Sequence, residues 1–178
     1  MSVPAWARVP GQGAYARTET ERRFLLTRLP DGLGPGRRIE DRYLDGTSLR
    51  LRRVEGDGLV VCKLTQKVRV SGEDPAVVRI TNLYLGEDEH RRLQALPGAV
   101  LVKVRRPWRD GFVVDEHTGP LAGLVLAELE VDDLGAALPG VPGPSAVAGL
   151  GREVTHDDRW SGGRLARATA DDLPGLLG

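Results

Sequence analysis

The sequence predicts a mainly β domain of the α+β class, built from an antiparallel sheet or barrel with a few flanking helices. About eight short runs have strand-like composition, and turns rich in Gly, Pro and Asp separate them. Only one segment, residues 87–96, has a clear helical pattern. A parallel sheet would need a helix between most strands, so this order of elements favours antiparallel pairing.

The positions of these runs give the predicted elements in order. The strands cover residues 18–26, 38–44, 48–54, 59–68, 77–85, 99–108, 110–117 and 123–133. The segment "EGDG" (55–58) separates two of them as a turn. Helix 87–96 begins with three acidic residues, which the helix dipole favours, and "PG" ends it. A second short helix is predicted at 133–138, and a strand end followed by a helix at 152–177.

The length of the chain indicates how many domains it forms, and its net charge limits the classes of partner. The 178 residues suit one domain, with residues 1–14 as a loose extension and 15–178 as the folded part. Lys+Arg and Asp+Glu both number 25, so no overall field directs the protein to nucleic acid or to a membrane. Cys62 is the single cysteine, which excludes an internal disulfide and a multi-cysteine zinc site. The sequence has no apolar signal segment and no run of ~20 apolar residues, so we expect a soluble cytoplasmic protein.

In several predicted strands, charged residues alternate with apolar ones, and the sign of the charge differs between strands. The alternating basic residues include Arg50, Arg52, Lys63, Lys103 and Arg105, and the acidic ones are Glu19, Glu21, Glu128 and Glu130. Period-two alternation gives each strand one charged face and one apolar face. A solvated polar face explains any single strand. The segregated signs, and the Glu-x-Glu pairs at opposite ends of the strand order, favour closure into a barrel with a charged interior.

Such an interior suits a metal–phosphate complex. Clustered carboxylates repel one another unless a cation such as Mg²⁺ lies between them, and arginine and lysine bind phosphate. Simpler roles stay open: the first Glu-x-Glu pair as a solvated edge, and the two arginines of the third strand in ion pairs with Glu40 or Asp41. Four residues are expected outside the site: Lys67, Arg53 and Arg106 at strand ends or on the other face, and His90 on the helix surface.

Several short motifs follow one another in order along the chain. Residues 19–23 read Glu-Thr-Glu-Arg-Arg, and "LRLRR", "CKLTQK", "LAELEV" and "EVTHDDRW" come after them. Together these segments, over about residues 15–167, resemble the CYTH domain of the triphosphate tunnel metalloenzyme superfamily, in its small bacterial single-domain form. The resemblance implies an eight-stranded antiparallel closed barrel, a triphosphate tunnel, that binds a triphosphate and requires Mg²⁺ or Mn²⁺.

The resemblance also implies roles for individual residues. The metal would be held by Glu19, Glu21, Glu128 and Glu130. The phosphates would be bound by Arg50, Arg52, Lys63, Arg79, Lys103, Arg105 and Arg159. Catalytic roles are implied for Arg23, Glu21 and Asp115.

Two departures from the family pattern concern catalysis. Arg23 stands where the family usually has lysine in its Glu-x-Glu-x-Lys motif; arginine keeps the charge but is larger and does not readily deprotonate. In the middle strand, Thr81 and Leu83 stand at the positions that are typically acidic after Arg79. A second metal ion would therefore lack the carboxylate ligands that these positions would supply.

The predicted function is that of a metal-dependent phosphohydrolase, which cleaves inorganic tripolyphosphate or an organic triphosphate. Two alternatives stay open: a non-catalytic module that binds polyphosphate or a nucleotide, and an adenylyl cyclase. The expected partner is a small-molecule triphosphate or polyphosphate, and a homodimer is an open alternative to a monomer.

Overall fold

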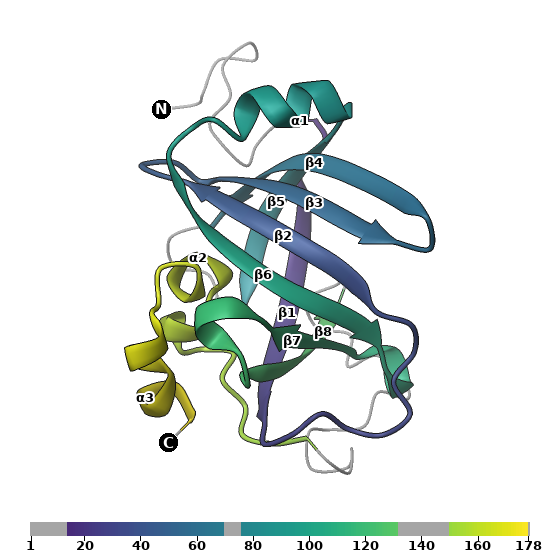
Figure 1. Ribbon diagram of the computed structural model, residues 1–178, viewed down its shortest axis with the longest axis vertical. Helices are drawn as coiled ribbons and strands as arrows, with labels where there is room; N and C mark the ends of the chain where they lie inside the picture. Colours follow the sequence, from purple (N-terminus) through teal and green to yellow (C-terminus); the bar gives the residue numbers. More distant parts are fainter. Residues whose placement is uncertain (1–13, 70–75, 132–149, 178) are drawn as a thin grey trace, which may run out of the picture.

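Eight antiparallel strands close into a barrel in the computed structural model, which describes residues 14–69, 76–131 and 150–177 (Figure 1). The strands are β1 (Arg17–Leu26), β2 (Arg37–Leu44), β3 (Leu49–Gly56), β4 (Leu59–Val68), β5 (Val77–Leu85), β6 (Gly98–Pro107), β7 (Val113–His117) and β8 (Val125–Val131). Their order around the barrel is β1-β5-β4-β3-β2-β6-β7-β8, and β8 pairs with β1. The predicted closed antiparallel barrel is confirmed.

The observed elements lie close to the predicted ones. β4 and β5 begin and end at the predicted residues, and the other strands differ only at their ends. Helix α1 (Glu87–Leu93) stops before the predicted residue 96, because Leu96 precedes Pro97 and the residue before a proline is disfavoured in a helix. The predicted extension, apart from Ala14, and the predicted helix 133–138 lie outside the described residues.

The turn between β3 and β4 shows why the segment "EGDG" ends one strand and begins the next. Asp57 and Gly58 both adopt positive φ, 54° and 74°, while Gly56 pairs with Leu59. A two-residue turn with two positive φ values has the twist that antiparallel strands require. Aspartate and glycine are residues that accept this conformation, so the local sequence fixes this hairpin.

The outward faces of β1, β7 and β8 are apolar and covered. Their buried cluster contains Phe24, Leu26, Phe112, Val114, Val125, Ala127 and Leu129. Leu33, Trp108 and Leu150, from segments outside the strands, pack against it. Here, loop segments of the same chain cover the apolar outer face of the barrel.

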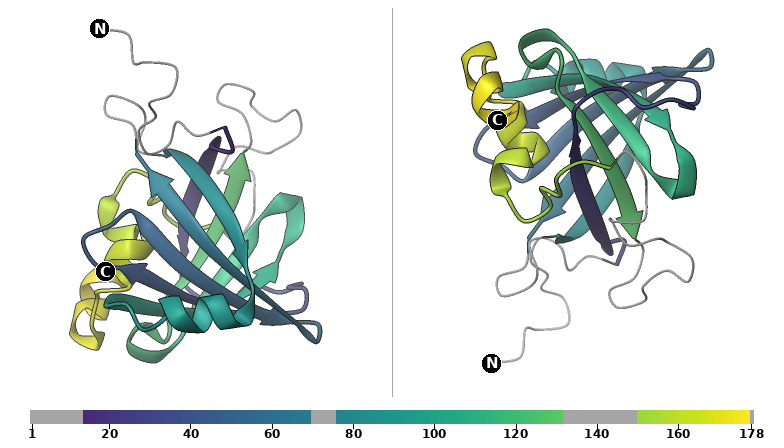
Figure 2. Two further views of the ribbon diagram at one scale, coloured as in Figure 1. Left: turned by 90° about the horizontal axis from the view of Figure 1, so that it is seen from above. Right: turned by 90° about the horizontal axis from the view of Figure 1, so that it is seen from below.

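The C-terminal segment packs against one end of the barrel, and Figure 2 shows its helices lying together on one side. It contains η4 (Asp158–Trp160), α2 (Gly162–Leu165), η5 (Ala170–Asp172) and α3 (Leu173–Leu177). Trp160 is 1% exposed and packs in one cluster with Leu25, Leu101 and Leu126, which strand alternation directs inward. The backbone N–H of Leu25 donates to the carbonyl of Arg152 (2.8 Å), which ties this segment to β1.

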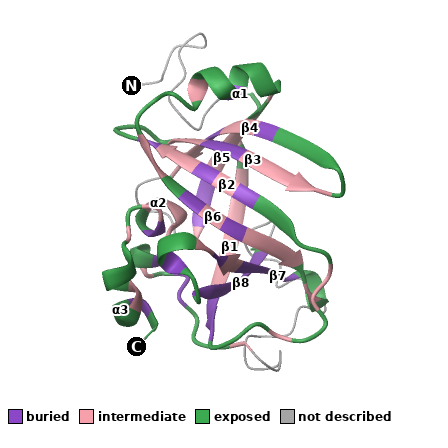
Figure 3. Ribbon diagram, viewed as in Figure 1, coloured by how far each residue is buried: buried purple, intermediate pink, exposed green. Residues whose placement is uncertain are grey.

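Buried residues gather in the strands, whereas α1 and α3 are largely exposed (Figure 3). His90 is the exception on α1. It is 6% exposed, which corrects the predicted surface position, because α1 lies against β4 and β5. Among the described residues, no helix has the length and apolar character needed to cross a bilayer.

Replacing Trp160 with alanine should lower the free energy of unfolding by about 3–5 kcal/mol, because a large buried side chain leaves a cavity where the C-terminal segment meets the barrel. Leu177→Ala in the same segment should change it by no more than about 0.5 kcal/mol, since Leu177 is 46% exposed. Urea denaturation of both variants measures the difference. Equal losses would show that the segment is not docked through Trp160.

Candidate active site

The barrel encloses a charged cavity of about 560 Å³. All eight strands contribute to its lining, together with Asp158, Ser161, Gly162 and Gly163 from the C-terminal segment. Such a volume is typical of small-molecule sites. Among the described residues, nine basic and five acidic side chains line the cavity, an excess of four positive charges. The lining as a whole therefore favours an anion.

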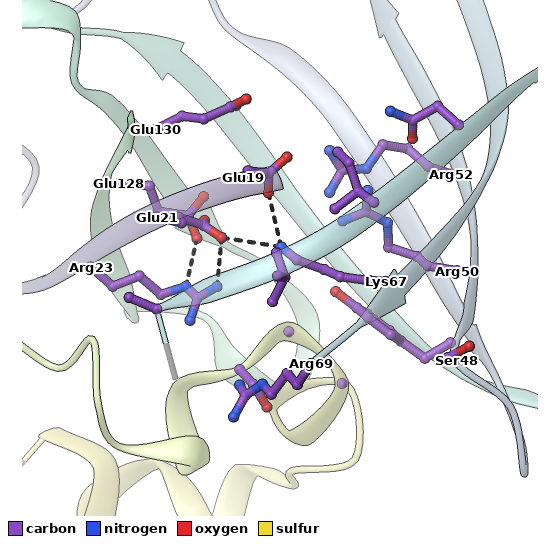
Figure 4. A pocket seen from close by; sticks show the side chains of 18 of the residues that line it. Glu19, Glu21, Arg23, Ser48, Arg50, Arg52, Lys67, Arg69, Glu128 and Glu130 are labelled. Carbon is purple, nitrogen blue, oxygen red and sulfur yellow. Dashed lines mark hydrogen bonds and ion pairs between the residues drawn. The ribbon is translucent and has the colours of Figure 1, made fainter. Parts of the chain in front are cut away.

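Four glutamates form one wall of this cavity (Figure 4). Glu19 and Glu21 come from β1, and Glu128 and Glu130 from β8. Because β1 pairs with β8, Glu21 lies opposite Glu130 and Arg23 lies opposite Glu128. Closure of the barrel thus brings together the two Glu-x-Glu pairs that stand at opposite ends of the strand order.

Among the described residues, three cations pair with these glutamates: Lys67 and Arg23, which Figure 4 labels, and Arg105, whose Nη2 contacts Glu128. Lys67 Nζ is 3.1 Å from Glu19 Oε1 and 3.3 Å from Glu21 Oε2. Arg23 Nη2 is 2.6 Å from Glu21 Oε2, and its Nε is 3.4 Å from Glu128 Oε1. Burial alone would lower the pKa of Arg23, but Glu21 and Glu128 raise it above its ordinary value. Arg23 therefore stays charged and holds two of the carboxylates.

The position of Lys67 corrects the sequence prediction, which placed it outside the site. β4 continues to Val68, and Lys67 lies on the same inward face as Lys63. Strand alternation therefore carries it into the cavity, next to β5 and β1. Arg53 and Arg106, which received the same prediction, do not line the cavity.

A basic wall lies beside and opposite the glutamates, and one of its members, Arg105, pairs directly with Glu128. It is formed by Arg50, Arg52, Lys63, Lys103 and Arg105. Arg50 Nε lies 3.6 Å from Asp41 Oδ1, but it is buried and has no hydrogen-bond partner among the described residues. Burial lowers the pKa of Lys63 to about 8, and the charges of Arg52 and Arg50 act in the same direction. An anion in the cavity would give Arg50 Nε a hydrogen-bond acceptor and would place a negative charge near Lys63.

Two aspartates lie fully buried beneath this wall and hold three of its cations. Asp41 accepts from Arg52 Nε (2.6 Å) and Nη2 (2.7 Å). Asp115 accepts from Arg105 Nε (2.7 Å) and Nη2 (2.6 Å), and also from Lys103. Burial alone would raise the pKa of each carboxyl, but the neighbouring cations lower both well below the usual range. Both aspartates are therefore ionised at neutral pH.

These pairs answer two questions that the sequence left open. Arg52 and Arg50 both pair with Asp41, at 2.6 Å and 3.6 Å, as the simpler alternative proposed, but both arginines still line the cavity. Asp115 does not line the cavity, so the geometry fits a residue that positions Lys103 and Arg105 better than one that contacts metal or water.

Two predicted phosphate ligands lie elsewhere. On β5, Val78, Ile80 and Asn82 line the cavity, so alternation directs Arg79 to the outer face. The inward register of β5 is thus one residue away from the predicted one, and Thr81 and Leu83 also face outward. Arg159 has a side chain 64% exposed and pairs with Asp157 (2.6 Å) instead of facing the cavity.

Sequence reasoning also missed residues at the cavity mouth. Asp158 lines the cavity and lies 3.1 Å from Arg69, which links the C-terminal segment to the end of β4. Tyr43 from β2 contributes an aromatic ring close to Gly162, where an added Cβ would meet the Tyr43 hydroxyl at 1.9 Å. Alternation along β2 signals Tyr43. The placement of Asp158 comes from tertiary docking, which leaves no local signal.

A scan against protein-family models and a search of curated proteins gave no match. Solved structures do match. The inorganic triphosphatase NE1496 superposes with a TM-score of 0.52 at 25% identity, over 84% of this chain and 95% of that chain. A second structure of NE1496, described as a hypothetical protein, gives a TM-score of 0.53 at 25% identity, over 84% and 98%. The fold is that of the CYTH domain.

The CYTH fold implies a metal, and the glutamate wall can be tested for it. Within the described residues, no group of three or more acidic, histidine or cysteine side chains is gathered closely enough to hold a metal ion. The Lys67 ammonium, however, contacts Glu19 and Glu21 together, so their oxygens converge on one cation position. Carboxylate oxygens are the ligands that Mg²⁺ and Mn²⁺ prefer. These two carboxylates fit such an ion, provided that Lys67 moves away from them.

Asp115→Asn should lower the free energy of unfolding at neutral pH by about 3 kcal/mol or more, because it leaves the buried Lys103 without its counter-ion and leaves Arg105 with Glu128 alone. In the wild type this contribution is present above the ordinary aspartate pKa and is lost as pH falls toward the lowered one. Denaturation with urea measures it. Asp157→Asn, at the surface pair with Arg159, should have little effect, and a similar loss there would contradict the assignment.

The pKa of Lys63 predicts a pH dependence of anion binding. Tripolyphosphate affinity should be steady below about pH 8 and should fall above it, by up to about tenfold per pH unit, because Lys63 loses its charge. Calorimetric titrations across this range measure the fall. Lys63→Arg keeps the charge and should flatten the curve relative to the wild type. If affinity falls with pH in the same way for both proteins, Lys63 does not bind the anion.

Proposed function

We propose that the protein is a triphosphatase that uses Mg²⁺ or Mn²⁺ and cleaves the terminal phosphoanhydride bond of a small triphosphate inside the barrel. The observation that carries this proposal is the glutamate wall with a basic wall beside and opposite it in one enclosed cavity of about 560 Å³. The similarity to the inorganic triphosphatase NE1496, at 25% identity, supports the same class of reaction and makes inorganic tripolyphosphate the first substrate to test.

The cations would meet the phosphates in two ways. Arg52, Lys103 and Arg105 are held by buried aspartates, so their positions are set before the substrate enters. Arg50 Nε lacks a hydrogen-bond acceptor among the described residues, and Lys63 has a lowered pKa; a bound phosphate would supply the acceptor and a negative charge. Together these cations would orient the chain of phosphates so that a water molecule attacks the terminal phosphorus in line with the bond that breaks.

The metal would be held by Glu19, Glu21, Glu128 and Glu130, and would supply positive charge that offsets the negative charge developing on the phosphate during cleavage. Arg23 lies between Glu21 and Glu128 and keeps both carboxylates oriented toward the cavity. Its raised pKa makes it unsuited to accept a proton, so we assign it a positioning role in place of the predicted catalytic one.

Phosphate release from tripolyphosphate, with Mg²⁺ or Mn²⁺ added, tests the proposal. Glu19→Gln and Glu130→Gln should each lower kcat/KM by about 100-fold or more, because each removes a charged oxygen donor from the glutamate wall. Glu116→Gln is the matched control: Glu116 pairs with Arg106 (2.6 Å) and does not line the cavity, so activity should stay close to wild type. Wild-type turnover in both wall variants would end the proposal.

A polyphosphate-binding module without turnover is the second candidate, and the inward face of β5 favours it. Val78, Ile80 and Asn82 line the cavity there, and none of them is acidic. Lys67 also neutralises two of the four glutamates. Calorimetric binding of tripolyphosphate with no phosphate release would support the module, and formation of cyclic AMP from ATP would indicate an adenylyl cyclase.

A further inference from the structure

A second, smaller cavity of about 150 Å³ lies at the end of the barrel where β2 and β7 begin and β3 and β6 end. It is lined by Arg37, Ile39, Arg52, Val54, Arg105, Pro107 and Val113. This volume has room for a single phosphoryl group.

The smaller cavity continues the larger one along the barrel. On β3, Arg50 and Arg52 line the larger cavity, and Arg52 and Val54 line the smaller. Arg105 and Val113 also line both. The two guanidinium groups shared between the cavities therefore form part of the partition between them.

The lining of the smaller cavity is cationic. Among the described residues it contains three arginines and no acidic residue, and the other four residues are apolar. Buried carboxylates already pair with two of these arginines: Asp41 with Arg52, and Asp115 and Glu128 with Arg105. These bonds use Nε and Nη2, so Nη1 of each guanidinium makes no such bond among the described residues. The apolar side chains cannot accept from these donors, so an anion is the ligand that fits.

Arg37 distinguishes this cavity from the larger one, because it lines only the smaller. Its side chain lies over Gly56, where an added Cβ would meet Arg37 Cγ at 2.6 Å, and its guanidinium pairs with Asp57 (3.3 Å). Both partners of this pair are more than half exposed, so the pair is weak and Arg37 is available to a stronger anion.

We propose that the smaller cavity is a second anion site, which binds one phosphoryl group through Arg37, Arg52 and Arg105. The group is either free orthophosphate or the end of a polyphosphate chain longer than a triphosphate. Binding at this site does not depend on hydrolysis. Orthophosphate is also the product that the proposed triphosphatase would release, and only this link rests on the proposed function.

Calorimetry of the full chain with orthophosphate, at constant ionic strength, tests the site. Arg37→Glu should weaken one class of orthophosphate binding by about tenfold or more, because it replaces a positively charged donor with a carboxylate that repels the phosphate. Arg38→Glu is the matched control, since Arg38 pairs with Glu40 (2.9 Å) and does not line the cavity. It should leave that binding unchanged. Because the Arg37 pair is exposed, both variants should fold.

A second titration series separates the two sources of the phosphoryl group. If Arg37→Glu weakens orthophosphate, the site takes the free ion. If it weakens only a longer linear polyphosphate, and leaves tripolyphosphate and orthophosphate unchanged, the site takes a chain end. If none of these ligands distinguishes Arg37→Glu from Arg38→Glu, the proposal is wrong. Loss of tripolyphosphate turnover in the glutamate variants alters none of these readings, so the two proposals fail separately.

Discussion

The pairing of β1 with β8 is the constraint on which the rest of the structure depends. It removes both edges of the sheet, and it sets Glu21 directly opposite Glu130. Like charges that face each other across paired strands are destabilising unless a cation lies near them. Lys67 and Arg23 meet that need in this structure. An acidic wall that must recruit cations adds little to stability, and its presence is better explained by function.

The barrel interior carries a second cost, that of burying charge. Asp41 and Asp115 are fully buried, and each is held by cations that lower the pKa of its carboxyl. A buried charge is tolerable only when it is paired and hydrogen-bonded, so these pairs restrict how the strands can pack. The same pairing fixes Arg52, Lys103 and Arg105 in place. Charge burial thus produces a basic wall whose geometry exists before any ligand arrives.

Much of this architecture could be predicted from the sequence, because period-two alternation is a local signal. It gave the bounds of β4 and β5 and the segregation of acidic and basic strands. The resemblance placed Arg79 among the phosphate ligands, and alternation could not correct this, because Val77, Val78 and Ile80 are apolar on both faces and either register of β5 fits. The resemblance also misplaced Arg159, because the docking of the C-terminal segment is tertiary. There, packing of Trp160 and Leu165 decides that Asp158, and not Arg159, reaches the cavity.

The inward face of β5 explains why Lys67 matters. With Val78 and Ile80 in place of acids, the cavity has its acidic side chains on the wall formed by β1 and β8, apart from Asp158 at the mouth. Lys67 belongs to β4, which is separated from β1 by β5, and its side chain extends past β5 to Glu19 and Glu21. A triphosphate would attract Lys67 away from them, so that Glu19 would lose the cation that contacts it here while Glu21 kept its pair with Arg23. On the proposed function, the anion and a divalent cation must therefore enter together, because each removes the electrostatic cost that the other would create.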